Sequence, residues 1–306
     1  MLFVRLDAIG DALTLVPAIA ALRHHGFRIG AVLRPVNAQV FSRGAVDCVH
    51  VDGAQAVPQL LASIRGQRYG AALIPTEKPE GYRVARQAEI PIRIGFENGW
   101  GKPLKTLWIR RMCTRTIFRT AGLDARAPHE CEVVFKLVQA ITGAPEPPRD
   151  PNVLRPCVLD EEPRYDERIA FQVTDKWQRL GASLESVAHL AKHVEQRHAV
   201  RYIAAEQEAT YVRAFAEATG ATVETFVHLA PWKSAIAAAR AVVAPDSGAA
   251  HVAGMVGTPV VSCFAAQDFA LQSKRWAPWA APHEVVRMES LWPLVAADAL
   301  EDVLRR

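Results

Sequence analysis

The sequence lacks the signatures of several common enzyme classes. No G-x-G-x-x-G motif opens a helix, so a nicotinamide-dependent dehydrogenase is not expected, and no G-x-S-x-G elbow predicts a serine hydrolase. The segment "GFENGWGKP" departs from a phosphate-binding loop, because Phe96 replaces the first glycine and Pro103 replaces the final serine or threonine. The five cysteines are widely spaced and form no C-x-x-C pair, so we expect reduced thiols and no metal site.

Long uninterrupted hydrophobic runs are also missing. The least polar long stretch, from Ala241 to Phe264, is broken by proline, aspartate, glycine and histidine, and therefore predicts buried α/β core rather than a membrane span. The apolar N-terminal segment could be mistaken for a signal peptide, but Arg5, Asp7 and Asp11 interrupt it and no clear small-residue cleavage site follows. We therefore expect a cytoplasmic protein.

The chain does contain enough apolar material for a large core. Half of its 306 residues are hydrophobic and 22 % are charged, which is typical of a globular chain with one large domain or two ordinary ones. The net charge of +4 is uneven: residues 1–150 carry 20 Lys+Arg and 13 Asp+Glu, a balance of +7, whereas residues 151–306 carry 16 and 19, a balance of −3.

The basic excess is concentrated in one run of the first half. This run contains a single acid, Asp124, and its basic residues are Lys102, Lys105, Arg110, Arg111, Arg115, Arg119 and Arg126. Such a run can be an ordinary solvated surface, or it can bind an anionic ligand or surface, because arginine suits phosphate and carboxylate groups. The residues alone leave both interpretations open.

Strand-like apolar runs alternate with helical patterns in both halves, which indicates parallel α/β layers. The expected strands are "MLFV", "IGAVL", "CVHV" and "GAALIP" in the first half, and "RIAFQV", "RYIAA", "ATVETF", "RAVVAP" and "TPVVSCF" in the second. Between them, residues 143–156 hold five prolines in fourteen positions and are expected to form a linker. The sequence thus predicts two α/β domains, residues 1–150 and 151–306, with a ligand-binding cleft at the carboxyl ends of their strands.

The first candidate functional residue is Asp11. The segment "RLDAIGDALTLVPAIAALR" follows an apolar strand, turns near Gly10, and then continues with helical spacing, so Asp11 lies at a helix start. An aspartate there can simply cap the helix by accepting backbone N–H bonds. It can also act as a general base, since it lies at the carboxyl end of a strand.

Two further segments of the second half are typical of phosphate binding. In "VVAPDSGAAHVAGMVGTPVVSCF", a strand is followed by a turn at Asp246 and Ser247, and by a helix that opens with small residues and carries His251 on its first turns. Such a helix start binds phosphate through free backbone N–H groups, although Asp246 could be an ordinary cap. In "FQVTDKWQRLG", Thr174 and Lys176 follow another strand, where the lysine could neutralise a diphosphate or be a surface charge.

In order along the chain, these segments resemble glycosyltransferase family 9, the bacterial lipopolysaccharide heptosyltransferases. The opening "VRLDAIGDALTLVPAIAALR" is similar to the N-terminal signature of the family, and "DKWQRL" resembles the element that begins its second domain. The segment "APDSGAAHVAGMVGTPVVSCF" resembles the Asp-Thr/Ser-Gly-x-x-His motif, and "AAQDFALQSKRWAPW" resembles the closing element. The resemblance spans nearly the whole chain.

The resemblance implies the GT-B fold, in which two Rossmann-like domains have parallel sheets that face a central cleft. It implies an inverting transfer, without a metal or other cofactor, of heptose from ADP-heptose, bound by residues 151–306, to lipopolysaccharide inner core, bound by residues 1–150. Asp11 takes the position of the catalytic base, and the diphosphate and nucleotide positions are Lys176, Asp246, Ser247, Gly248 and His251. Thr174 and Ala249, in the same two turns, complete the expected donor site.

The acceptor implied by the resemblance is an anionic glycolipid. Its expected contacts are Arg110, Arg111, Arg115 and Arg119 of the basic run, with peripheral contact at the cytoplasmic face of the inner membrane and no nucleic-acid partner. The chain departs from the family where an acid commonly holds the ribose, because Pro231 and Trp232 stand there. A different nucleotide sugar, a protein acceptor, or a nucleotide-sugar-binding protein without turnover therefore stay open as alternatives.

Overall fold

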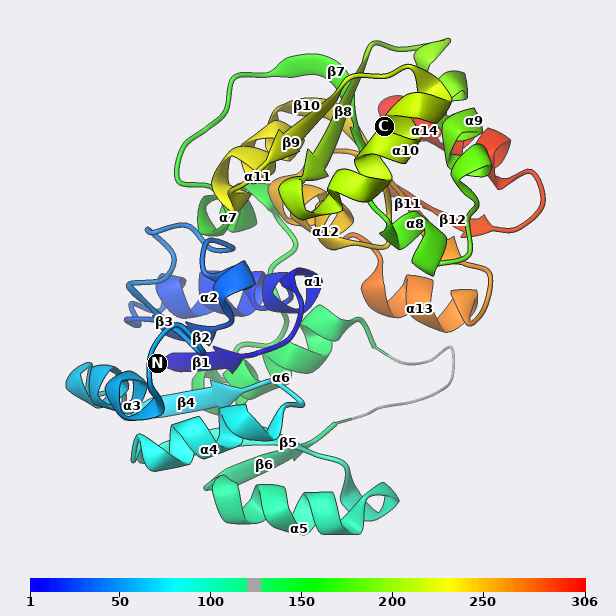
Figure 1. Cartoon of the computed structure of the whole chain (residues 1–306). Helices are drawn as coiled ribbons and strands as arrows, with labels where there is room; N and C mark the ends of the chain where they lie inside the picture. Colours follow the sequence, from blue (N-terminus) through cyan, green and yellow to red (C-terminus); the bar gives the residue numbers. More distant parts are fainter. Residues whose placement is uncertain (120–127) are drawn as a thin grey trace. The chain divides into compact units, whose positions relative to one another are not determined.

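The computed structural model describes residues 1–119 and 128–306, and the chain divides into two compact units, Met1–Arg149 and Asp150–Arg306 (Figure 1). Each unit contains one six-stranded sheet in which all neighbouring strands are parallel. In both sheets the strand order reverses once. Because the strands are parallel, the chain segments that follow neighbouring strands lie close together at the carboxyl edge of the sheet.

The sheet of the N-terminal unit has the order β3-β2-β1-β4-β5-β6. Its strands are β1 (Leu2–Arg5), β2 (Gly30–Leu33), β3 (Cys48–Val51), β4 (Ala71–Ile74), β5 (Ile92–Glu97) and β6 (Arg115–Phe118). Its helices are α1 (Ile9–Leu13), α2 (Val16–His24), α3 (Val57–Gly66), α4 (Pro79–Gln87), α5 (Pro103–Met112) and α6 (Glu130–Thr142), with short 3₁₀ helices η1 (Pro35–Asn37) and η2 (Gly99–Gly101).

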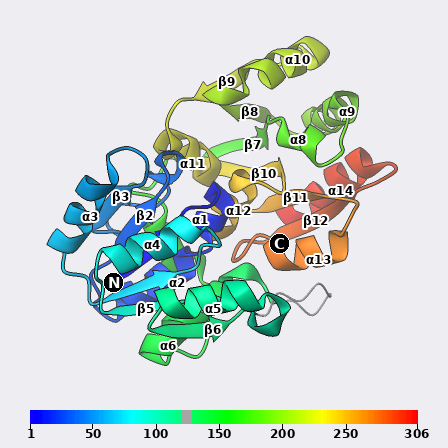
Figure 2. The ribbon, with the colours of Figure 1, turned by 60° about the horizontal axis from the view of Figure 1, so that its bottom comes forward.

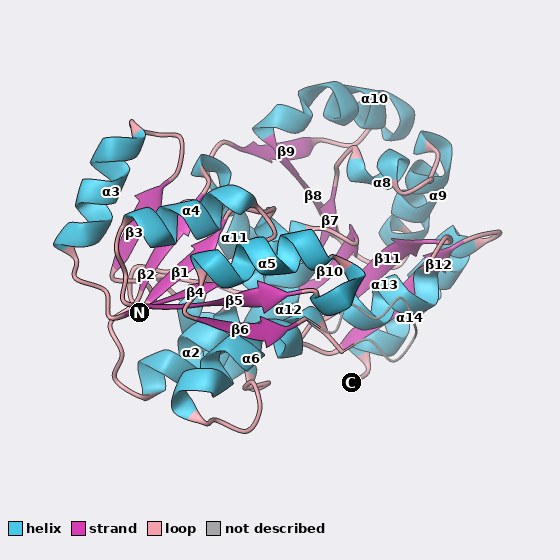
Figure 3. Cartoon of the chain, turned by 90° about the horizontal axis from the view of Figure 1, so that it is seen from below, coloured by secondary structure: helices cyan, strands magenta, loops and turns pink. Residues whose placement is uncertain are grey.

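Helices cover both faces of this sheet (Figure 3). Helices α3, α4 and α5 lie on one face, and α2 and α6 lie on the other. The first face packs buried side chains such as Val4 and Ile74 of the strands against Leu60, Tyr82 and Ile109 of the three helices. Because residues on both faces of the central strands are apolar, these strands are buried on both sides, as expected for a parallel sheet.

The sheet of the C-terminal unit has the order β12-β11-β10-β7-β8-β9. Its strands are β7 (Asp166–Gln172), β8 (Val200–Ala205), β9 (Val223–Phe226), β10 (Ala239–Pro245), β11 (Val260–Ala265) and β12 (His283–Met288). Its helices are α7 (Pro151–Leu154), α8 (Lys176–Arg179), α9 (Leu184–Glu195), α10 (Ala209–Thr219), α11 (Leu229–Ala238), α12 (Gly248–Val256), α13 (Phe269–Trp276) and α14 (Trp292–Leu304), with η3 (Arg155–Cys157) and η4 (Glu206–Glu208).

Aromatic rings fill one face of the second sheet. Phe171 of β7 stacks with Trp177 of α8 and with Phe215 of α10, each pair with ring centroids 6.0 Å apart, and Trp177 stacks on Trp292 of α14 at 5.6 Å. All four side chains are buried, and such ring pairs add about 0.5–1.5 kcal/mol each beyond the burial of their area. The cluster therefore anchors α8, which begins the candidate donor site, to the core.

The start of the C-terminal unit is fixed to helix α12. Asp150 caps α7 by accepting a hydrogen bond from the Asn152 N–H. Gly257, which ends α12 with φ +82°, leaves room for Pro151, since a Cβ at Gly257 would lie 2.7 Å from the Pro151 Cβ. The proline-rich stretch that the sequence predicts to be a linker thus contains a short helix that packs on the C-terminal unit.

The fold prediction is confirmed, because both sheets are parallel and carry helices on both faces. All nine predicted strands are present, while β5, β6 and β12 were not predicted. Among the helices of residues 1–119 and 128–306, none is both long enough and apolar enough to cross a membrane.

Candidate active site

In the N-terminal unit, Asp11 lies in the first turn after the central strand. Helix α1 begins at Ile9, directly after the β1 turn, and Asp11 is its third residue. One carboxylate oxygen, Oδ2, accepts a hydrogen bond from the Ala8 N–H at 3.2 Å, and the other, Oδ1, accepts one from Arg5 Nη2 at 2.6 Å. The side chain is 29 % exposed. Asp11 therefore caps its helix, and its carboxylate also reaches the surface at the carboxyl edge of the sheet.

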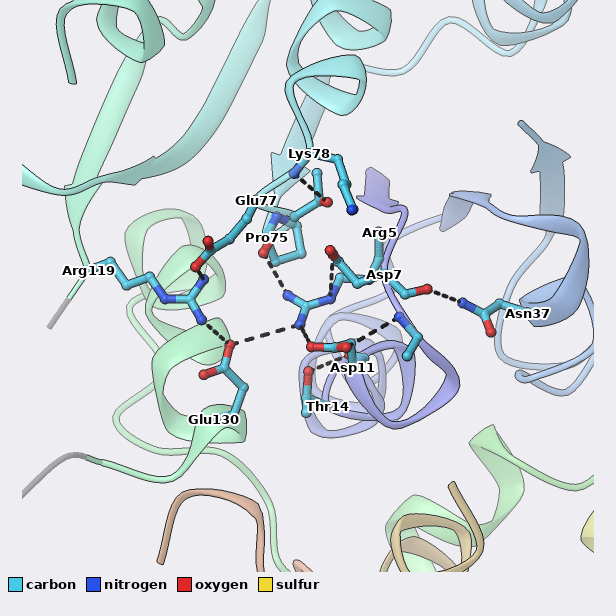
Figure 4. Close-up of polar contacts among 12 residues, drawn as sticks. Arg5, Asp7, Asp11, Thr14, Asn37, Pro75, Glu77, Lys78, Arg119 and Glu130 are labelled. Atoms are coloured by element: carbon cyan, nitrogen blue, oxygen red, sulfur yellow. Dashed lines mark hydrogen bonds and ion pairs between the residues drawn. The ribbon is translucent and has the colours of Figure 1, made fainter. Parts of the chain in front are cut away.

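Arg5 is the residue that holds Asp11, and it is almost completely buried (Figure 4). Its guanidinium donates to the Pro75 carbonyl at 2.6 Å through Nη1, and its Nε lies 3.3 Å from Asp7 Oδ2 without forming an aligned hydrogen bond. Nη2 also lies 3.9 Å from Glu130 Oε1. Since a buried charge is costly unless it is paired, the three surrounding carboxylates stabilise Arg5 and fix it against Asp11.

Glu130 connects Arg5 and Asp11 to Arg119, which follows the edge strand β6. It is the first residue of α6, is fully buried, and accepts a hydrogen bond from Arg119 Nη2 at 2.7 Å. Arg119 Nη1 also pairs with Glu77 at 3.2 Å. Two arginines from β1 and the end of β6 thus share one buried carboxylate, which joins Asp11 to residues far from it in sequence.

The residues of the predicted basic run differ in burial and in pairing. Arg119 is buried and neutralised by acids, and Arg110 makes a bidentate ion pair with Glu97 at 2.6 and 2.7 Å. This hydrogen-bonded pair lowers the pKa of the Glu97 carboxyl below its usual value. Arg115 donates to the Ala140 carbonyl at 2.8 Å, and Arg111 is exposed. Arg126 and Asp124 lie outside the described residues.

In the C-terminal unit, three of the predicted donor-binding side chains lie together. Lys176 Nζ lies 3.9 Å from Asp246 Oδ2, and His251 Nε2 lies 3.7 Å from Asp246 Oδ1. Lys176 follows β7 and Asp246 follows β10, and these strands are neighbours in the sheet. The parallel register therefore brings a lysine, an aspartate and a histidine to one point of the carboxyl edge.

Helix α12 opens at the same point. Ser247 is its N-cap in an extended conformation, and its Oγ is buried without a hydrogen-bond partner. Gly248 and Ala249 form the first turn, where backbone N–H groups have no partner within the helix. Further along, Gly254 packs directly on another segment, because a Cβ there would lie 2.7 Å from the Trp279 backbone nitrogen. The helix start, with its small residues and free N–H groups, is thus suited to an anion.

Glu208, which the sequence analysis did not identify, braces the loop that carries Lys176. The Thr174 hydroxyl donates to Glu208 Oε1 at 2.8 Å, and the Asp175 N–H donates to Glu208 Oε2 at 2.9 Å. Thr174 also accepts a bond from the Lys176 N–H at 3.2 Å. Thr174 is buried and its hydroxyl is engaged by Glu208 and the Lys176 N–H, and its expected contact with the donor stays a prediction. The sequence signal that could have identified Glu208 is its place just after β8, the strand that pairs with β7.

A buried tryptophan lies in the region where the family resemblance leads one to expect an acid that holds the ribose. Trp232 of α11 is buried, and its indole N–H donates to Gln172 Oε1 at 3.1 Å. The next residue, Lys233, is also buried and donates to the Val158 carbonyl at 2.6 Å, and burial lowers its pKa to about 8. Within residues 1–119 and 128–306, no group of three or more His, Cys, Asp or Glu side chains is arranged to hold a metal ion.

Comparison with known proteins places this geometry in context. Residues 184–300 match the family model of glycosyltransferase family 9 (heptosyltransferase). A glycosyl transferase family 9 structure from Veillonella parvula is 14 % identical, with a TM-score of 0.75 over 99 % of this chain and 96 % of that one. No match is found among curated proteins.

Two E. coli structures are similar over almost the full length of both chains. The ADP-heptose lipopolysaccharide heptosyltransferase II is 17 % identical, with a TM-score of 0.75 over 99 % of this chain and 98 % of that one. Heptosyltransferase WaaC with ADP is 17 % identical, with a TM-score of 0.73 over 99 % of each chain. These similarities confirm the predicted GT-B fold.

Proposed function

We propose that this chain is a glycosyltransferase that transfers heptose from ADP-heptose to the inner core of lipopolysaccharide with inversion, since its C-terminal unit carries the family 9 pattern. The observation that carries the proposal is the open start of α12, where the Ser247 hydroxyl is buried without a partner beside Lys176 and Asp246. A diphosphate is the group that such a helix start and lysine suit.

The donor would bind to the C-terminal unit. Lys176 and the N–H groups of Gly248 and Ala249 would face the diphosphate, and Ser247 Oγ would gain the hydrogen-bond partner that it lacks. His251 and Asp246 would hold one another beside the nucleotide. As the bond from the anomeric carbon to the diphosphate breaks, this positive potential would stabilise the negative charge that develops on ADP.

The acceptor would be activated by Asp11. Its carboxylate would take the proton of the acceptor hydroxyl while that oxygen attacks the anomeric carbon from the side opposite to ADP, which inverts the configuration. Arg5 would keep the carboxylate oriented, since its 2.6 Å bond to Oδ1 leaves Oδ2 to face the acceptor and Ala8. The proposal needs neither a metal nor another cofactor.

The proposed acceptor is an anionic glycolipid at the cytoplasmic face of the inner membrane. Of the four arginines expected to contact it, Arg110 and Arg111 of α5 and Arg115 of β6 are exposed. Arg119 is satisfied by Glu130 and Glu77, so its proposed role is to support the Asp11 group from within.

The direct test is transfer itself. The purified protein, ADP-heptose and an inner-core glycolipid are incubated, and the product is examined by mass spectrometry and by NMR of the new anomeric centre. We expect an acceptor heavier by one heptose, with the configuration opposite to that of the donor. ADP binding without any transfer to the glycolipid would refute the proposed reaction.

One observation favours a second candidate within the same enzyme class. Trp232 and its bond to Gln172 occupy the region where the family commonly has an acid for the ribose, so the nucleoside can differ from adenosine. Calorimetric titration of the protein with ADP, UDP, GDP and dTDP separates the two candidates. Tighter binding of another diphosphate than of ADP would replace ADP-heptose as the donor.

A further inference from the structure

Three large apolar side chains lie exposed on the segment that follows β5. Trp100 of η2 is 94 % exposed, and Leu104 and Leu107 of α5 are 83 % and 59 % exposed. Single exposed leucines are common, but an almost fully exposed tryptophan beside two leucines on adjoining turns is a clustered patch, which marks an interaction site. We call this patch, together with Lys102, Lys105 and Arg111, the α5 surface.

The patch is not explained by packing within the N-terminal unit. Helix α5 already has a buried side, where Thr106 and Ile109 face the sheet. Leu104 and Leu107 are three residues apart and therefore lie on the same outward side of the helix. The helix thus has a second apolar stripe that nothing in the described part of the chain covers.

Positive charge surrounds this stripe. Lys102 and Arg111 are exposed, and neither takes part in an ion pair between described residues, while Lys105 has only a distant contact with Glu77 at 3.8 Å. Helix α4 lies beside α5 and adds exposed Arg83 and Arg86 (Figure 2). The acids of the same two helices and of the adjoining β5 are fewer: Glu80 is exposed, and Glu97 is paired with Arg110.

The α5 surface also begins at the functional edge of the sheet. Helix α5 starts just after β5 and η2, and Asp11 follows β1, so the start of α5 and Asp11 lie at the carboxyl edge of the same parallel sheet (Figure 3). A lipid surface that contacted Trp100 and Leu104 would therefore meet the N-terminal unit at the edge where the acceptor is expected.

We propose that the α5 surface docks on a membrane surface that contains anionic phospholipids. Trp100, Leu104 and Leu107 enter the headgroup region, and Lys102, Lys105 and Arg111 contact lipid phosphates. Tryptophan and leucine beside basic residues are the composition of interfacial helices, and the excess of basic over acidic side chains there matches a negatively charged surface. The docking itself is independent of turnover, but its purpose, bringing a glycolipid acceptor to Asp11, rests on the proposed function.

The test is co-sedimentation of the full chain with two kinds of vesicle, phosphatidylcholine alone and phosphatidylcholine mixed with phosphatidylglycerol. We expect binding to the mixed vesicles that weakens as salt rises, because the charge attraction is screened. Leu104→Ser and Trp100→Ser should each weaken the partition about tenfold, since each removes a large apolar side chain from the lipid interface. The double variant Lys102→Glu, Arg111→Glu should weaken it by roughly tenfold or more at low salt.

Matched controls carry the same changes elsewhere. Val227→Ser removes an apolar side chain that is 67 % exposed in the C-terminal unit, and Lys192→Glu reverses an exposed charge on α9. Both should bind vesicles as the unchanged protein does, and all variants should keep its melting temperature and ADP affinity, because the altered side chains lie on the surface.

Three outcomes would decide against the docking surface. If the unchanged protein does not bind mixed vesicles, or if Leu104→Ser and Trp100→Ser bind as tightly as it does, the proposal is overturned. The proposal is equally overturned if these variants abolish self-association of the protein in ultracentrifugation without affecting vesicle binding, since the patch would then join two copies. Vesicle binding with no transfer activity would refute the proposed function and leave the docking surface standing.

Discussion

The substitution Asp11→Asn tests the base assignment, because it keeps the shape of the side chain and removes its ability to take a proton. The amide oxygen can still accept a hydrogen bond from the Ala8 N–H or from Arg5, so the start of α1 should be retained. General-base loss lowers turnover by about 10² to 10⁴-fold. ADP affinity should stay unchanged, because the predicted donor residues belong to the other unit.

The stability cost follows from the surroundings of Arg5. Breaking a fully buried ion pair costs about 3–5 kcal/mol, but Asp11 is 29 % exposed and Arg5 keeps Asp7 at 3.3 Å and Glu130 at 3.9 Å as carboxylate neighbours. We therefore expect Asp11→Asn to lower the free energy of unfolding by about 1–2 kcal/mol, less than the loss of a fully buried pair. For a unit of this size, that loss lowers the melting temperature by roughly 2–8 °C. The variant should stay folded at assay temperature.

Asp7→Asn is the matched control, since it removes a negative charge beside the same guanidinium without touching Asp11. Its transfer rate should stay within a few-fold of the unchanged protein, while its melting temperature should fall by a similar amount to that of Asp11→Asn. Transfer rate, melting temperature and calorimetric ADP affinity are measured for both variants. An equal loss of transfer in the two would refute the reasoning, because the effect would then come from Arg5 and not from a missing base.

The remaining predictions concern the C-terminal unit. Lys176→Ala should weaken ADP binding by about tenfold or more through loss of a charge-assisted contact, whereas Arg179→Ala on the same helix should not; equal calorimetric affinities would remove Lys176 from the donor site. Glu208→Gln should weaken ADP binding a few-fold, because the amide cannot accept both the Thr174 and Asp175 bonds, and an unchanged affinity would show that the brace is dispensable. Gly254→Ala should lower stability by about 1–3 kcal/mol, seen as a reduced melting temperature, since its Cβ would meet the Trp279 backbone. Burial lowers the pKa of Lys233 from 10.5 to about 8, so between these pH values the folded state binds fewer protons than the unfolded state. The free energy of unfolding should therefore rise by about 3 kcal/mol as the pH increases across that window. In denaturant titrations, the Lys233→Met variant should lack this rise.

The fold was largely predictable because parallel strands are buried on both faces and appear as apolar runs. Strands β5, β6 and β12 were missed since polar residues interrupt them: β5 contains Arg93 and Glu97, β6 begins at Arg115, and β12 contains Glu284 and Arg287. Both β6 and β12 lie at the edge of a sheet, where a strand needs apolar side chains on fewer sides.

The candidate site was predictable only where its residues stand in short motifs. Asp11, Lys176 and the start of α12 follow strands in the sequence, and parallel topology places such segments at one edge. The contacts of Arg5 with Pro75 and Glu130 join residues 70 or more positions apart, and no local pattern predicts them. The burial of Arg119 likewise depends on Glu130 and Glu77, so a count of charges along the chain overstated the exposed basic surface.

The seating of α7 on α12 determines where the two units can be separated for study. A chain that starts at Asp150 keeps the Asp150 cap and covers Gly257 with Pro151, so the end of α12 stays closed. A chain that starts after Cys157 exposes that end and also loses Arg155, whose guanidinium donates to the Val256 carbonyl at 2.7 Å. The C-terminal unit should therefore be expressed from Asp150 onward, which would give a small protein in which the proposed nucleotide binding can be tested by NMR titration or ligand soaking.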